Sequence, residues 1–240
     1  MRARGLVPVA TALLGNRLDE ARRWLGRAVE IEPGEKEPAA LLAEVHYRCG
    51  EFRQAASLFR AAGAEAVAEN LESFKTSVPY AIEGEARATR VKFIHTDPLP
   101  LVAVRVNGGE EVNFIIDTGA AEVCIDTEFT GQVGAARSGS VSGTFGGGQR
   151  AAVEQGRIDS LTLGDSVVRN LPVQILNTRR FDVAARGRRV DGILGTRLFY
   201  RFLTTLDYPA GELVLRRKAA GSLKRFERQA RTEKQVVVPF

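Results

Sequence analysis

Cysteine and histidine are scarce in this chain of 240 residues, which contains two of each. Cys49 falls in an N-terminal part rich in Ala and Leu and Cys124 in a strand-rich part, so a disulfide framework is not indicated. Because His46 and His95 lie far from Cys124 in sequence, a Cys-His or Ser-His-Asp site has little support. No His-Glu-x-x-His or paired Cys-x-x-Cys motif occurs, so we expect no metal site.

A run of apolar residues long enough to span a membrane is also missing, and we expect a soluble protein. Residues 1–5 followed by 6–14 have some character of a secretory signal, but Pro8 and the lack of a clear cleavage site argue against one. The compartment stays open between the cytoplasm and the periplasm or secretion. With 44% hydrophobic residues, the chain has enough apolar sequence for a globular core.

A broad basic face is missing as well, because the excess positive charge is confined to one segment. Residues 216–234 contain eight Lys or Arg and two Glu, a surplus of six, and the whole chain carries +5, so the remainder carries −1. We therefore expect no nucleic-acid partner. The segment could bind an anionic partner, but a solvated linker or helix is the simpler interpretation.

The most informative segment that is present covers residues 114–120, Phe-Ile-Ile-Asp-Thr-Gly-Ala. An apolar run leads directly into Asp117, and Gly119 permits a tight turn, which predicts a buried strand that ends with a carboxylate. A carboxylate at a strand end can exchange protons with water. Asp-Thr-Gly alone is also common as a plain turn, so the interpretation depends on the rest of the chain.

A second apolar element, residues 190–195, reads Val-Asp-Gly-Ile-Leu-Gly and could by itself be only a buried strand and turn. Leu198, Phe199 and Phe202 follow at helical spacing, which predicts a short helix.

The surrounding region is rich in short strand-like runs. Hairpins are predicted around Asn-Gly-Gly at 107–109 and around Pro-Ala-Gly at 209–211. Further strand-like runs cover 152–163 and 167–176, the second interrupted at 170–172. We therefore expect this region to be all-β.

Taken together, these segments resemble the retropepsin-like branch of the aspartic proteases over roughly residues 91–215. The resemblance implies an all-β, barrel-shaped acid protease lobe that hydrolyses peptide bonds with two aspartates and an activated water, and that needs no cofactor. The implied catalytic loop is Asp117, Thr118 and Gly119, in which Thr118 braces the facing loop. The implied supporting element is Ile193, Leu194 and Gly195.

Residues 138–149 are small and polar with one aromatic, and they predict a mobile hairpin tip. Such a hairpin could close over a substrate as a flap and exclude water. The flap residues expected to contact substrate are Thr144, Phe145, Gly146, Gly147 and Gly148. A plain surface loop is the alternative, and a phosphate-binding loop is disfavoured because no Gly-Lys-Ser/Thr follows.

The implied mechanism requires two carboxylates that share one proton, so activity is expected at acid to mildly acid pH. Only one Asp-Thr/Ser-Gly is present, because the segments at 126–128 and 159–161 lack the glycine. A homodimer could supply the second aspartate. A second lobe could do so instead, with 235–240 as its opening strand if the chain is truncated. Asp191 is a further candidate, although a turn or surface role fits it better.

Residues 1–75 are rich in Ala, Leu, Glu and Arg without strand-like alternation, which predicts helices. At a shift of 34 residues, segment 15–21 matches segment 49–55, and Pro33 follows the first unit. This pattern resembles about two tetratricopeptide repeats and implies docking of a protein partner or substrate. Sequence could be missing at the start of this module, and an unrelated helical hairpin is the alternative.

We therefore expect a multidomain α and β chain, with a tetratricopeptide-like helical module at 1–75, a protease lobe at 80–215 and a basic linker at 216–240. The expected function is an aspartic endopeptidase acting on a protein or peptide. The alternative is a catalytically silent peptide-binding or scaffold protein that uses the repeats. A group of arginines before residue 190 could shape substrate preference, or form a mobile surface loop: Arg179, Arg180, Arg186, Arg188 and Arg189.

Overall fold

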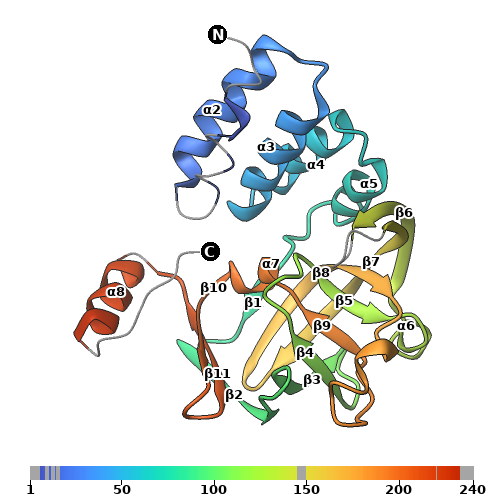
Figure 1. Cartoon of the computed structure of the whole chain (residues 1–240), viewed down its shortest axis with the longest axis vertical. Helices are drawn as coiled ribbons and strands as arrows, with labels where there is room; N and C mark the ends of the chain where they lie inside the picture. Colours follow the sequence, from blue (N-terminus) through green and yellow to red (C-terminus); the bar gives the residue numbers. More distant parts are fainter. Residues whose placement is uncertain are drawn as a thin grey trace. The chain divides into compact units, whose positions relative to one another are not determined.

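The computed structural model describes residues 6–8, 11, 14, 17–144, 150–219 and 221–232. The chain divides into two compact units, with the division between Lys75 and Thr76. The first unit is helical and the second is dominated by strands (Figure 1). Across the described residues, no helix is both long enough and apolar enough to cross a membrane.

The helical unit confirms the helices expected in the N-terminal part, and each of its longer helices packs against the next. Ala21 and Leu25 of the first of these helices meet Leu42 and Val45 of the second in one apolar cluster. The helices are α2 (Leu18–Ile31), α3 (Lys36–Arg48), α4 (Phe52–Ala61) and α5 (Glu65–Ser73).

The second unit is built on an eleven-stranded sheet with the order β10-β11-β2-β3-β4-β9-β5-β8-β7-β6, and β1 pairs with β8. The strands are β1 (Ala81–Glu83), β2 (Ala88–His95), β3 (Leu101–Val106), β4 (Glu111–Ile116), β5 (Val123–Asp126), β6 (Ala136–Thr144), β7 (Arg150–Leu163), β8 (Ser166–Leu176), β9 (Gly192–Leu194), β10 (Phe202–Asp207) and β11 (Glu212–Arg217).

The strand pairing returns on itself, because β3 also pairs with β7 through Arg105 and Val106. A closed barrel requires a contact of this kind. The structure shows a large sheet together with helices. Closure of the sheet into a barrel stays a prediction.

Both predicted short hairpins are confirmed by antiparallel pairing, of β3 with β4 and of β10 with β11. In the first, Asn107 and Gly108 have φ of 51° and 72°, the consecutive positive values that an Asn-Gly turn accommodates. β6 and β7 form a further antiparallel hairpin. Its tip, residues 145–149, and the side chain of Thr144 lie outside the described part, so the predicted flap contacts fall there too.

Three details differ from the sequence-based expectations. β8 runs without a break through residues 170–172, because the pairing of Leu171 and Pro172 with β7 outweighs the local turn signal of Asn170 and Pro172. The predicted helix is only the short α7 (Thr196–Phe199), and Phe202 already belongs to β10. β11 runs two residues into the expected linker, to Arg217, and the rest of that segment contains α8 (Ser222–Thr232), in keeping with the linker or helix expected there.

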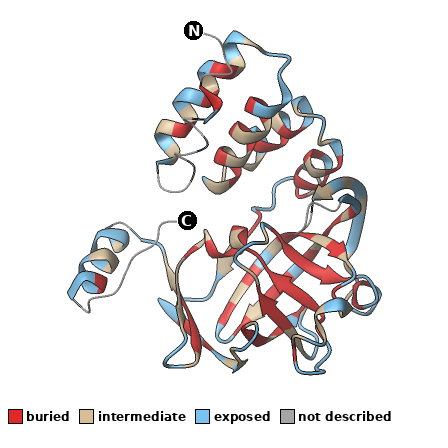
Figure 2. Ribbon diagram, viewed as in Figure 1, coloured by how far each residue is buried: buried red, intermediate tan, exposed pale blue. Residues whose placement is uncertain are grey.

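The core of the second unit lies beneath the centre of the sheet, where Figure 2 shows buried residues concentrated on the inner strands. Leu101 of β3, Ile115 of β4, Cys124 of β5 and Ile193 of β9 belong to one buried apolar cluster. Burial of these adjoining strands stabilises the sheet at the point where β4 ends.

Candidate active site

Asp117 follows directly after β4, whose last three residues are all buried. β4 pairs in parallel with β9, which sets Ile116 opposite Leu194. The backbone N–H of Asp117 then donates to the carbonyl oxygen of Leu194 at 3.2 Å. The apolar run therefore forms a buried strand, and the hydrogen bond at its end fixes the backbone of Asp117.

The loop after β4 folds back onto the Asp117 carboxylate. The N–H of Gly119 donates to Asp117 Oδ1 at 2.8 Å, and the N–H of Ala120 donates to the Asp117 carbonyl oxygen at 3.1 Å. Asp117 is half-buried, whereas Thr118 and Gly119 are exposed. The arrangement presents an oriented carboxylate at an open surface.

Direct contacts between the Asp117 side chain and other acidic side chains would take the form of hydrogen bonds or ion pairs. Within the described residues, no hydrogen bond or ion pair joins its side chain to another acidic side chain. The Thr118 hydroxyl likewise has no hydrogen bond to the described part of the chain. Among the described residues, the hydrogen bond that the Asp117 carboxylate accepts is the one from the N–H of Gly119.

The segment Ile193–Leu194–Gly195 lies directly beside the loop. An added Cβ on Gly195 would overlap the carbonyl group of Glu122, so only glycine permits this approach. The N–H groups of Thr196 and Arg197 donate to the carbonyl oxygens of Ala120 and Ala121, both at 2.9 Å. Backbone contacts from two segments thus hold the loop.

A buried ion pair under this loop was missed by the sequence analysis. Arg197 of α7 donates to Glu122, and the side chains are 11% and 6% exposed. The Tyr80 hydroxyl donates to the other Glu122 oxygen at 3.3 Å. The only sequence signal was a glutamate in the otherwise apolar run 120–125, and nothing local indicated its partner.

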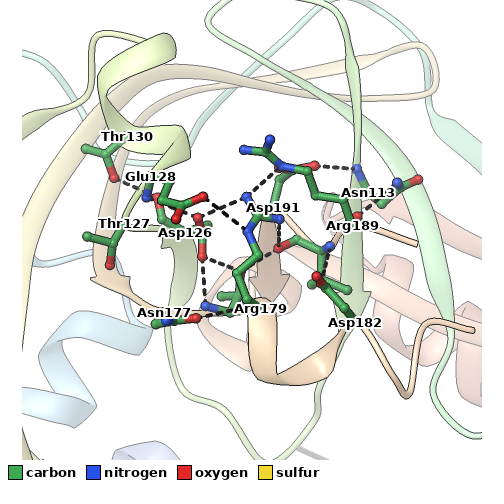
Figure 3. Close-up of polar contacts among 12 residues, drawn as sticks. Asn113, Asp126, Thr127, Glu128, Thr130, Asn177, Arg179, Asp182, Arg189 and Asp191 are labelled. Atoms are coloured by element: carbon green, nitrogen blue, oxygen red, sulfur yellow. Dashed lines mark hydrogen bonds and ion pairs between the residues drawn. The ribbon is translucent and has the colours of Figure 1, made fainter. Parts of the chain in front are cut away.

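A second polar cluster, the Asp126 cluster, lies where β5 ends and consists of Asp126, Thr178, Arg179, Arg189 and Asp191. Figure 3 labels Asp126, Arg179, Arg189 and Asp191. Asp126 Oδ2 accepts hydrogen bonds from the N–H and the hydroxyl of Thr178 at 2.9 and 3.1 Å. Arg179 Nη2 lies 3.1 Å from Asp126 Oδ1 and 3.4 Å from Asp191 Oδ1. Arg189 Nε lies 2.7 Å from Asp191 Oδ1.

The environment of Asp126 favours its charged form. Desolvation by burial alone would raise the pKa of this carboxyl. Hydrogen bonds from the N–H groups of Thr178 and Glu128 and the charge of Arg179 act in the opposite direction and hold the pKa below its ordinary value. Arg179 therefore bridges two aspartates, and the loop it belongs to is anchored at that point.

This geometry rules out Asp191 as the second carboxylate beside Asp117. Asp191 immediately precedes β9, and its N–H donates to the carbonyl oxygen of Asn113 at 2.8 Å. Asp117 pairs with Leu194 at the other end of the same strand. Three residues of strand, about 10 Å, therefore separate their backbones, and Asp191 is bound to two arginines.

The arginines that precede residue 190 make different contacts. Arg179 and Arg189 hold the Asp126 cluster together, and the mobile-loop interpretation of this segment stays a prediction. Arg186 donates to the carbonyl oxygen of Asp97 at 3.2 Å. Arg180 lies over the ring of Phe181, with its guanidinium carbon 4.8 Å from the ring centroid. In the described part of the chain, no three His, Cys, Asp or Glu side chains are arranged to hold a metal ion.

The comparison with known families bears directly on this region. Residues 102–198 match the family model described as aspartyl protease. The aspartyl protease match contains β4, the Asp117 loop, β9 and most of α7, and it supports an aspartic protease function in general terms. No curated protein sequence matches the chain.

Solved structures of retropepsin-like proteins are similar to part of this chain. A retropepsin-like aspartic protease from Rickettsia conorii is 19% identical with a TM-score of 0.38, over 57% of this chain and 93% of that one. The retroviral protease-like domain of Ddi1 from Leishmania major is 18% identical with a TM-score of 0.34, over 49% and 87%. EIAV protease bound to the inhibitor HBY-793 is 18% identical with a TM-score of 0.31, over 44% and 88%.

Proposed function

We propose that this chain is an aspartic endopeptidase in which Asp117 supplies one carboxylate of a catalytic pair. The observation that carries the proposal is the exposed loop after β4, in which the N–H of Gly119 orients the Asp117 carboxylate at 2.8 Å. The match of residues 102–198 to the aspartyl protease model gives independent support. Thr118 and Gly119 complete the proposed catalytic loop, and Ile193, Leu194 and Gly195 brace it.

The chemistry assigns different tasks to two facing carboxylates. Two like charges at close range cannot both ionise readily, so the pair holds one proton between its members. The ionised member takes a proton from a water molecule, which attacks the peptide carbonyl carbon. The protonated member donates a hydrogen bond to the carbonyl oxygen, where negative charge develops. Neither step requires a cofactor.

The second carboxylate is proposed to be Asp117 of a second copy of the chain. Around a two-fold axis, the same loop of both copies would meet, and each Thr118 hydroxyl could then hydrogen-bond the opposite loop. The exposure of Thr118 and Gly119 is what such a contact requires. A second lobe carrying its own aspartate would serve the same chemistry.

The remaining parts are proposed to serve substrate capture. Residues 80–215 form the protease lobe, closed as a barrel, and the β6–β7 hairpin acts as its flap through residues 144–148. Residues 1–75 act as a tetratricopeptide-like docking module. In support of this, α2 and α4 begin at Leu18 and Phe52, the 34-residue shift seen in the sequence, and Ala21 and Ala55 are equally buried. Residues 216–240 act as a basic linker that includes α8.

The proposal is tested by Asp117→Asn, which keeps the size of the side chain and removes its charge. Proteolysis of a denatured protein substrate should be lost, with an unchanged thermal unfolding profile. Asp159→Asn is the matched control, because Asp159 is exposed and precedes Ser160 without a following glycine. Retained proteolysis in Asp117→Asn would overturn the proposal. Absence of proteolysis in the purified wild-type dimer, with partner binding intact, would favour a scaffold.

A further inference from the structure

Tyr80 is a buried tyrosine just before β1, and it lies outside the region that matches the aspartyl protease model. The residue is 3% exposed. Its φ is 56°, in the left-handed region that a bulky side chain rarely adopts. Residues held in this conformation cost free energy and are concentrated at functional sites. Tyr80 is therefore a candidate for a role beyond packing.

Contacts from two parts of the second unit hold Tyr80 in this conformation. The N–H of Tyr80 donates to the carbonyl oxygen of Asn170 at 3.2 Å. The side-chain amide of Asn170 in turn donates to the carbonyl oxygen of Val78 at 3.1 Å. The guanidinium carbon of Arg201 lies 5.4 Å from the centroid of the Tyr80 ring, within the range of a cation–π interaction. The backbone of Tyr80 is thus fastened to β8, and its ring to the turn between α7 and β10.

The Tyr80 hydroxyl contacts Glu122, the last residue of the loop that begins with Asp117. It donates to Glu122 Oε2 at 3.3 Å, and Arg197 donates to Oε1 of the same carboxylate. Glu122 is 5% exposed, so this carboxylate is buried with a partner on each oxygen. Rotation of the carboxylate would break these hydrogen bonds in a buried place, which is costly. The hydroxyl and the guanidinium together therefore fix the orientation of Glu122.

The loop between Asp117 and Glu122 is held at both ends. At its start, the N–H of Asp117 donates to the carbonyl oxygen of Leu194 at 3.2 Å. At its end, Arg197 binds the loop twice, through its own N–H to the carbonyl oxygen of Ala121 at 2.9 Å and through its guanidinium to Glu122. Because the loop is short and fixed at both ends, a shift of Glu122 is transmitted to Asp117.

The charges of Glu122 and Asp117 act on the same buried side chain, the Cys124 thiol. Burial is the largest cause that raises the pKa of this thiol, and the charges of Glu122 and Asp117 act in the same direction. Both carboxylates therefore lie within electrostatic range of Cys124. A displaced Glu122 carboxylate changes the electrostatic field around the Asp117 loop as well as its packing.

We propose that Tyr80 is a positioning residue for Asp117 and acts through Glu122. The inference rests on the proposed function and deepens it, because it assigns part of the catalytic geometry to a residue outside the matched region. The Tyr80 hydroxyl fixes the Glu122 carboxylate, which fixes the end of the loop, and the loop directs the Asp117 carboxylate toward the water that it activates. A misplacement of about 1 Å at a catalytic group can lower turnover about 100-fold, so one remote hydroxyl has a measurable effect.

The test uses Tyr80→Phe in the full chain, which removes the hydroxyl and keeps the ring, the left-handed backbone and the contact with Arg201. Tyr208→Phe is the matched control, because Tyr208 is 51% exposed in the turn between β10 and β11. Turnover is measured on a peptide that the wild type cleaves, where turnover per chain no longer rises with protein concentration and every variant is fully folded. In Tyr80→Phe, kcat should fall about 3- to 10-fold with KM unchanged, as expected for the loss of one hydrogen bond. Both constants should be unchanged in Tyr208→Phe, and an unchanged kcat in Tyr80→Phe would overturn the inference.

Amide hydrogen exchange separates this inference from the proposed function. In Tyr80→Phe, the N–H groups of Gly119 and Ala120 should exchange about 3- to 10-fold faster, whereas those of the β3–β4 hairpin should be unchanged. If the wild type cleaves no peptide, the proposed function fails, and faster exchange confined to the Asp117 loop would still support the positioning role. Unchanged exchange at Gly119 and Ala120, or equal acceleration throughout the chain, would refute that role in either case.

Discussion

Gly195 and Glu122 approach so closely that a Cβ on Gly195 would overlap the Glu122 carbonyl group. This approach keeps the segment after β9 against the Asp117 loop. Gly195 itself has an extended backbone, with φ of −92° and ψ of 172°, so the requirement for glycine comes from lack of space and not from the backbone angles.

The first prediction follows from that contact. Gly195→Ala should lower the free energy of unfolding by about 1–3 kcal/mol or more, because the overlap is with backbone that must shift. It should also reduce proteolysis, since the Asp117 loop would move. Gly131→Ala in α6 (Phe129–Gln132) is the control, because its Cβ would enter open space, and its stability should be unchanged or higher. Equal stability of both variants, measured by urea unfolding, would contradict the contact.

The buried pair between Arg197 and Glu122 gives a second prediction. Arg197→Met leaves the Glu122 carboxylate buried without its cation and should cost about 3–5 kcal/mol. Adding Glu122→Gln should recover part of that loss, because the uncompensated charge is removed. The exposed pair of Arg105 and Glu111 provides the comparison, and Arg105→Met should cost at most about 1 kcal/mol. A double-mutant cycle measures both pairs, and similar losses for the two would refute the burial argument.

The Asp126 cluster predicts a pH dependence of stability. The pKa of Asp126 is lowered in the folded chain, so the folded state binds fewer protons there than the unfolded state does in acid. Its contribution is therefore present above the ordinary carboxyl pKa of about 4 and lost as pH falls through the lower folded value. Asp126→Asn should cost about 1–3 kcal/mol at neutral pH, and the difference from wild type should shrink in acid. A pH-independent difference in urea unfolding would contradict this.

The two cysteines report on the packing beneath the Asp117 loop. Burial raises the pKa of the Cys124 thiol well above its ordinary value, with smaller contributions from the charges of Glu122 and Asp117. Because the thiolate is the reactive form, Cys124 should resist a thiol reagent until the chain unfolds, whereas exposed Cys49 should react at once. Ellman titration of the native chain should give one fast equivalent. A second fast equivalent would show that the core opens readily.

Local sequence patterns predicted several elements of this structure correctly. Asn-Gly-Gly at 107–109 predicts a hairpin because few residues accept two consecutive positive φ values. The run 114–120 predicts a buried strand that ends in Asp117, because both features lie within seven residues. Helices before residue 75 follow in the same way from composition.

Ion pairs and strand pairs between residues far apart in the chain could not be predicted from local sequence patterns. Arg179 and Asp126 are 53 residues apart, and Arg197 and Glu122 are 75 apart, so neither ion pair leaves a local pattern. The insertion of β9 between β4 and β5 depends on which buried strands pair, and apolar composition does not encode the partner. Continuous β8 illustrates the same limit, because its pairing with β7 outweighed the local turn signal of Pro172.

Asp117 is proposed to work as half of a carboxylate pair that two copies of the chain share. The most direct measurement mixes wild-type chain with Asp117→Asn chain in varying ratio at fixed total concentration, after subunit exchange. Only dimers with two wild-type chains hold the complete pair, so proteolysis should follow the square of the wild-type fraction. Proteolysis that falls in direct proportion to the wild-type fraction would show that each chain holds a complete site, and would contradict the account.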